Sequence, residues 1–165
     1  MTEKETAQPQ GVTLDDIKAF AERLAPKQRL IGIDAGTKTL GLALSDVTRS
    51  IASPLETIQR GKFAADAARL LHLAAEHKIA GFVLGWPANL DGTLGPRAQA
   101  TRAFARNVNR LAPYPILLWD ERLSTAAAER MLIEADASRK RRAEVIDKLA
   151  ATIILQGALD RLHTL

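Results

Sequence analysis

The chain has 165 residues, of which 47% are hydrophobic and 25% charged, so its composition is that of a globular domain with a buried core. It contains no cysteine, which excludes disulfide bonds and thiolate metal sites and is typical of a reducing cytoplasm. A net charge of +4 fits a polyanionic partner such as nucleic acid, although it serves solubility equally well.

The N-terminal 28 residues are predicted to be an extension of the main domain, which would span residues 29–165. The polar start MTEKETAQPQG contains no apolar segment of a signal peptide, and no later run approaches the roughly 20 apolar residues of a membrane span. We therefore expect a cytoplasmic protein without membrane contact. A short helix is predicted over Thr13–Leu24, with Thr13 as its cap.

Three strands are predicted next, and the turns between them are short and rich in Gly, Thr and Ser, which favours antiparallel hairpins. Helices and strands alternate after them, giving the order β-β-β-α-β-α-β-α-α. This order predicts an α/β fold with a central mixed sheet and helices on both faces. The predicted strands are Leu30–Asp34, Thr39–Asp46, Ile51–Gln59, Ile79–Trp86 and Pro115–Glu121, and the predicted helices are Phe63–Lys78, Arg97–Leu111, Thr125–Glu134 and Ala143–Leu162.

Acidic residues stand at the ends of predicted elements. Asp34 closes the first strand, Asp120 and Glu121 close the last, and Asp147 lies near the start of the final helix. Taken singly, a strand-end acid is better explained as a loop residue that reaches solvent. Asp46, which ends the second strand, is interpreted in this way, as the cap of a turn.

Asp147 differs because its face of the helix continues through small and apolar residues that should pack on the sheet, namely Ala150, Ala151, Ile154 and Ala158. An unpaired buried charge is costly, so Asp147 needs a partner. That partner is either a nearby base such as Lys148 or a cation shared with Asp34 and Glu121. Grouped carboxylates are the ligands that Mg²⁺ or Mn²⁺ prefers, and such ions assist phosphodiester hydrolysis.

Four segments make the chain resemble the YqgF (RuvX) family of resolvase-like nucleases, which have the ribonuclease H fold. They are GIDAGTKTLGLALSD, GWPANLDGTLGPRA, DERLSTAAAE and SRKRRAEVIDKLAATIILQ, and the match runs from Leu30 to Leu159. The resemblance implies a catalytic metal centre made by Asp34, Glu121 and Asp147. Strand alternation puts Asp120 and Glu121 on opposite faces, so the choice between them stays open. Trp86 departs from the family pattern, and either fills the core or stacks on a base.

Basic residues near these acids are candidates for contacts with nucleic-acid phosphates. Lys38 follows Asp34 by four residues, and Arg97 sits in the first turn of a helix, where the helix dipole favours an anion. Arg122 either contacts phosphate or pairs with Asp120. The stripe of Arg102, Arg106 and Arg110 fits a solvated helix face as well as a binding surface. The densest basic cluster contains Arg139, Lys140 and Arg142.

The leading hypothesis is a hydrolase: a metal-dependent endonuclease that, as the resemblance implies, processes the 5′ end of pre-16S rRNA in ribosome biogenesis. One alternative is a Holliday junction resolvase, whose paired cuts would need a homodimer rather than a monomer. Another is a ribosome-assembly factor that binds nucleic acid without catalysis. The GIDAGT motif also resembles the phosphate loop of actin-like kinases, but one copy in 165 residues leaves no room for their two domains.

Overall fold

The computed structural model describes residues 11–87, 95–121 and 139–165, except for the side chains of residues 139–147. The strands are β1 (Val12–Leu14), β2 (Arg29–Ala35), β3 (Thr39–Ser45), β4 (Ala52–Gln59), β5 (Ile79–Trp86) and β6 (Pro115–Asp120). The helices are α2 (Ile17–Glu22), α3 (Phe63–Glu76), α4 (Pro96–Asn109) and α6 (Arg139–Leu162). None of these described helices has the combination of length and apolarity that crossing a bilayer requires.

The strands form one mixed sheet in the order β1-β6-β5-β2-β3-β4. Strands β2, β3 and β4 pair antiparallel because their connections are too short for a crossover. Strands β5 and β6 continue the sheet in parallel on the other side of β2, since a helix precedes each of them. The predicted mixed sheet, with three antiparallel strands leading, is therefore confirmed.

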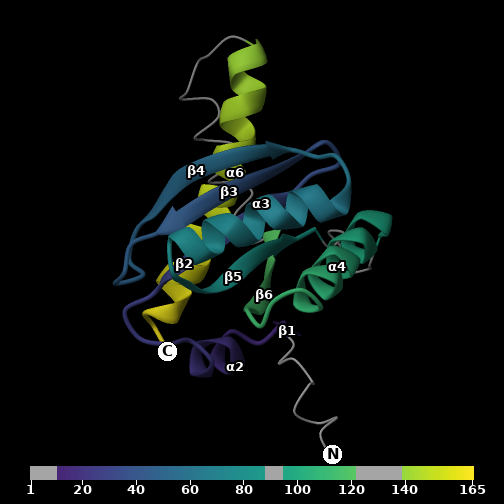
Figure 1. Ribbon diagram of the computed structural model, residues 1–165. Coiled ribbons are helices and arrows are strands. Elements are labelled where there is room, and N and C mark those ends of the chain that lie inside the picture. Colours follow the sequence, from purple (N-terminus) through teal and green to yellow (C-terminus); the bar gives the residue numbers. More distant parts are fainter. Residues whose placement is uncertain (1–10, 88–94, 122–138) are drawn as a thin grey trace, which may run out of the picture.

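Helices cover both faces of the sheet, and each face has its own core (Figure 1). One core lies under α3 and α4 and includes Ile31, Ile33 and Phe104. The other lies under α2 and α6 and includes Leu30, Val83 and Leu155. Successive residues of β2 enter opposite cores because side chains alternate across a strand.

Helix α6 packs directly on glycines of the sheet, where a larger side chain would not fit. A Cβ on Gly32 of β2 would lie 2.6 Å from Leu155 Cβ and 2.9 Å from the Ala151 carbonyl oxygen. A Cβ on Gly85 of β5 would lie 2.5 Å from Ile154 Cδ1. The predicted sheet-facing stripe of this helix is buried at Ala151, Ile154 and Ala158, as are Leu155 and Leu159, while Ala150 is half-buried.

The predicted helix Thr13–Leu24 is wrong over its first four residues. Thr13 lies in β1, which pairs in parallel with β6 at the edge of the sheet. The helix begins at Ile17, and Asp16 caps it by accepting hydrogen bonds from the backbone N–H groups of Lys18 and Ala19. Pairing with an unpaired strand edge outweighs the local helical pattern here.

The last helix also begins earlier than predicted, at Arg139 rather than Ala143. Arginine and lysine are good helix formers, and no Gly or Pro interrupts the segment, so the basic run extends the helix. The predicted helix Thr125–Glu134 lies outside the described residues.

Asp46 caps a turn, as predicted. Its carboxylate accepts hydrogen bonds from the backbone N–H groups of Ser50 at 2.8 Å and Ile51 at 3.0 Å, and from the Thr48 hydroxyl. These bonds lower the pKa of Asp46 to about 2. They hold the connection between β3 and β4.

Candidate functional site

Asp34 lies near the carboxyl end of β2, in the middle of the sheet. It is opposite Gly41 of β3 and follows Ile33, which pairs with Leu84 of β5. Gly32, two residues earlier, faces α6, so alternation puts Asp34 on the α6 face as well. Its side chain is only 16% exposed. The strand thus holds a carboxylate at the rim of the core.

Glu121 directly follows β6 and reaches over the neighbouring strand β5. The space is available because residue 85 is glycine: a Cβ there would lie 2.7 Å from Glu121 Oε1. Asp120 is in register with Trp86, whose ring packs on the core under α3 and α4. Asp120 therefore belongs to the opposite face, and the geometry favours Glu121 as the partner of Asp34.

The two carboxyl groups are electrostatically coupled. Burial raises the pKa of Glu121 to about 7, and the negative charge of Asp34 adds to this rise, against the opposing effect of Arg97. A hydrogen bond between the Glu121 and Asp34 side chains, in which protonated Glu121 is the donor, raises the pKa of Glu121 further. The two carboxyl groups therefore lie within hydrogen-bonding distance of each other at the rim of the core.

Arg97 lies beside this pair, in the first turn of α4. Its Nη2 atom is 3.8 Å from Asp34 Oδ1, and 53% of its side chain is exposed. Such a long and half-exposed ion pair leaves the guanidinium accessible to a second anion.

A small cavity of about 70 Å³ opens beside Arg97, and its lining includes Gly36, Thr37 and Arg60. Sequence reasoning missed Arg60. It follows β4, and the register that pairs Thr39 with Gln59 brings it to the β2–β3 turn. Its Nη1 donates to the Gly36 carbonyl at 2.5 Å, and its guanidinium lies 5.6 Å from the centre of the Phe104 ring. The predicted antiparallel pairing of β3 with β4 is the feature of the sequence from which Arg60 could have been placed near this turn.

The structure describes only some of the other residues that were predicted to belong to the site. Lys38 is exposed in the β2–β3 turn, and its carbonyl accepts the N–H of Arg60. Arg122 lies outside the described residues. The helix α6 contains Arg139, Lys140, Arg142 and Asp147, whose side chains are also outside the description. In the described part of the chain no three acidic or histidine side chains gather as metal ligands, so Asp34 and Glu121 stand there as a pair.

The sheet order, the two helical layers and the strand-end carboxylates define a nuclease fold of the ribonuclease H-like class. The solved structure of Thermus thermophilus RuvC in complex with a Holliday junction substrate superposes with a TM-score of 0.56. That similarity covers 83% of this chain and 97% of RuvC at 16% identity, so it concerns the fold.

Sequence comparison then identifies the family. The family described as "RuvX: Holliday junction resolvase" matches residues 28–161, and the chain belongs to it. A Paracoccus denitrificans relative named "Putative pre-16S rRNA nuclease" is 59% identical over 151 residues, which cover 92% of this chain and 96% of the relative. A Rhodobacter capsulatus relative of the same name is 60% identical over 149 residues, covering 90% and 92% of the two chains.

Proposed function

We propose that this protein is a metal-dependent endonuclease that hydrolyses phosphodiester bonds in structured RNA and processes the 5′ end of pre-16S rRNA. The observation that carries the proposal is the hydrogen-bonded pair of Asp34 and Glu121, which come from the ends of β2 and β6 and meet over β5. Relatives in the same family are named "Putative pre-16S rRNA nuclease". Ribosome biogenesis takes place in the cytoplasm of a bacterium, so the proposed location is cytoplasmic.

The residues fit a divalent cation. Asp34 and Glu121 supply only oxygen ligands, which suits Mg²⁺ or Mn²⁺, and their mutual repulsion would be relieved by a positive ion. Asp147 is the proposed third ligand, because α6 packs against β2, which carries Asp34, and against β5, over which Glu121 reaches. The chemistry supplied by a bound cation would be polarisation of the phosphorus centre and activation of water.

The chain's own basic groups would hold the substrate. Arg97 is already beside Asp34, and Arg60 lines the same cavity, so the two guanidinium groups can bind the phosphate that is cut. Arg60 is held by Gly36 and Phe104, which keeps its position defined before substrate binds. Further contacts to the nucleic-acid backbone are proposed for Lys38, Arg122, Arg139, Lys140 and Arg142.

A second candidate is cleavage of four-way DNA junctions. It is favoured by the description of the family and by the fold shared with RuvC, whose solved complex contains a Holliday junction. Both candidates use the same carboxylates and differ in the nucleic acid and in oligomeric state, since symmetric paired cuts need a homodimer.

The deciding experiment compares cleavage of a pre-16S rRNA fragment and a four-way DNA junction, each with Mg²⁺, Mn²⁺ or EDTA. We expect wild type to cut the RNA only with a divalent cation, and Asp34→Asn to fold normally but not cut. Asp46→Asn is the matched control, because it changes another strand-end aspartate outside the site. Equal cleavage by wild type and Asp34→Asn would refute the metal centre, whereas cutting of the junction alone would favour the resolvase.

A further inference from the structure

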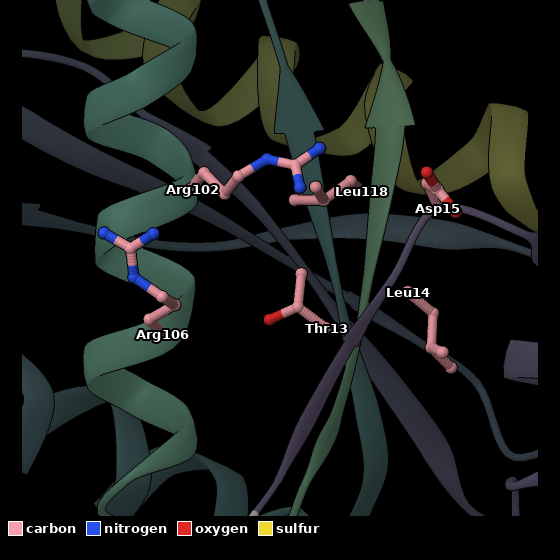
Figure 2. A pocket seen from close by; sticks show the side chains of 6 residues that line it. All are labelled: Thr13, Leu14, Asp15, Arg102, Arg106 and Leu118. Atoms are coloured by element: carbon pink, nitrogen blue, oxygen red, sulfur yellow. The ribbon is translucent and has the colours of Figure 1, made fainter.

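A second pocket lies on the other side of α4, between that helix and the N-terminal strand β1 (Figure 2). It has a volume of about 200 Å³, and its floor is formed in part by Leu118 of β6. The lining residues are Thr13, Leu14, Asp15, Arg102, Arg106 and Leu118. No residue of this pocket belongs to the site described above.

The pocket presents several hydrogen-bond donors to one space. Arg102 and Arg106 stand one helical turn apart on α4, so their Cα atoms are about 6 Å apart along the axis. In the part of the chain that the structure describes, neither guanidinium forms an ion pair with a carboxylate. In Figure 2 the Asp15 carboxylate stands apart from both.

Thr13 adds a hydroxyl donor. Its Oγ1 accepts a hydrogen bond from Asn109 Nδ2, which uses an acceptor position and leaves the hydroxyl hydrogen available. Figure 2 shows this hydroxyl directed towards α4. Two guanidinium groups and one hydroxyl around an open pocket suit a tetrahedral oxyanion such as a phosphate group.

The pocket lies on the α3/α4 face of the sheet, beside Trp86, and the candidate nuclease centre lies at the carboxyl edge of the same strands. The Arg102 guanidinium lies 5.1 Å from the centre of the Trp86 ring, and Trp86 is in register with Asp120, the residue before Glu121. Leu118 precedes Glu121 by three residues, about 10 Å along the strand, but faces the core under α3 and α4, whereas Glu121 faces α6. A nucleic-acid chain bound at Asp34 and Glu121 would therefore reach this pocket over the carboxyl edge of the sheet, past Arg97 and along α4.

We propose that the β1–α4 pocket binds a phosphate group of the nucleic-acid substrate, at a short distance from the phosphodiester that is cut. The inference rests on the proposed nuclease function and extends it to a second contact with the same strand. Arg102 has two roles in this arrangement: it orders the Trp86 ring and contributes a donor to the pocket. The N-terminal strand thereby becomes part of the substrate-binding surface.

The test measures binding of a fluorescent single-stranded RNA to the Asp34→Asn protein as salt is varied. We expect Arg102→Ala/Arg106→Ala to weaken binding at least about tenfold and to reduce the slope of log K against log salt by about 0.7, the value for one lost phosphate contact. Arg110→Ala is the control for each single variant, Arg102→Ala and Arg106→Ala: it removes one charge at the C-terminal cap of α4, outside the pocket, where Arg110 donates to Asn107. We expect it to bind as the parent does.

Equal weakening by Arg110→Ala would overturn the proposal, since it would show a diffuse effect of charge. Unchanged binding by the double variant would overturn it as well. Competition by millimolar inorganic phosphate as effective as that by unlabelled RNA would assign the pocket to free phosphate and exclude the nucleic-acid chain. Binding does not require cleavage, so a wild type without nuclease activity would refute the proposed function while the measured loss of binding stood.

Discussion

Replacing Glu121 by Gln should stabilise the metal-free protein at alkaline pH while abolishing cleavage. Folding raises the pKa of Glu121 from its ordinary value of 4.5 to about 7, so the folded state retains a proton that the unfolded state releases. Stability contributed by this group is therefore lost as the pH rises from about 4.5 to 7. Glutamine keeps the shape of the protonated acid and cannot ionise.

The size of the effect follows from the pKa. One pH unit corresponds to about 1.4 kcal/mol, so ionised Glu121 lowers the free energy of unfolding by at most about 3 kcal/mol at pH 8, and by less than about 1 kcal/mol at pH 5. With a denaturant dependence of about 2 kcal/mol per molar urea, Glu121→Gln should raise the urea midpoint at pH 8 by about 1.5 M.

The assay is urea unfolding of wild type and Glu121→Gln in EDTA at pH 5 and pH 8. Other titrating groups are common to both proteins, so the difference between them isolates Glu121. Asp120→Asn should have a smaller effect, because Asp120 faces the other side of the sheet and makes the smallest contribution to the raised pKa. The reasoning fails if Glu121→Gln is no more stable than wild type at pH 8, or if its advantage is the same at both pH values.

Three further predictions follow from contacts described above. Gly32→Ala should lower the free energy of unfolding by about 1–3 kcal/mol, because its Cβ would collide with Leu155. Gly61→Ala is the control and should not lower it, because there is open space around Gly61. Equal urea midpoints for the two variants would contradict this prediction. Arg60→Ala should reduce kcat/KM for RNA about tenfold, with little rescue by Arg60→Lys, since lysine lacks the planar fork; full activity would remove Arg60 from the site. Asp46→Ala should lower the free energy of unfolding at pH 7 by about 1 kcal/mol, as measured by urea unfolding. The pKa of Asp46 is lowered to about 2, so this difference should shrink as the pH falls from 4 towards 2.

Periodicity in the sequence was enough to predict most of the sheet. The strand Ile79–Trp86 was predicted with its observed bounds, since a continuous apolar run is typical of a strand buried on both faces. The N-terminal segment was mispredicted because Leu14 and Ile17 have helical spacing, yet β6 offers an unpaired edge that only the assembled sheet reveals. Local patterns carry no information about such distant partners.

The candidate site was predictable at the level of residue type and less so in its geometry. Asp34 could be identified because it interrupts an apolar strand. The choice of Glu121 over Asp120 depended on the register of β6 against β5 and on the space above Gly85. Arg60 was missed because its approach to Gly36 depends on the pairing of β3 with β4, which brings together residues 24 apart in sequence.

The pairing of β1 with β6 has a consequence for the behaviour of the protein in solution. Strand β6 contains the apolar sequence PILLWD, and β1 pairs with its first three residues, Pro115 to Leu117, on the outer side. A three-residue edge strand offers few backbone groups with which another chain can pair, whereas a longer apolar edge strand favours such pairing. A protein shortened to begin after residue 15 would expose that edge. We therefore expect the N-terminal segment to protect the protein from aggregation, and its removal to lower solubility before any other property.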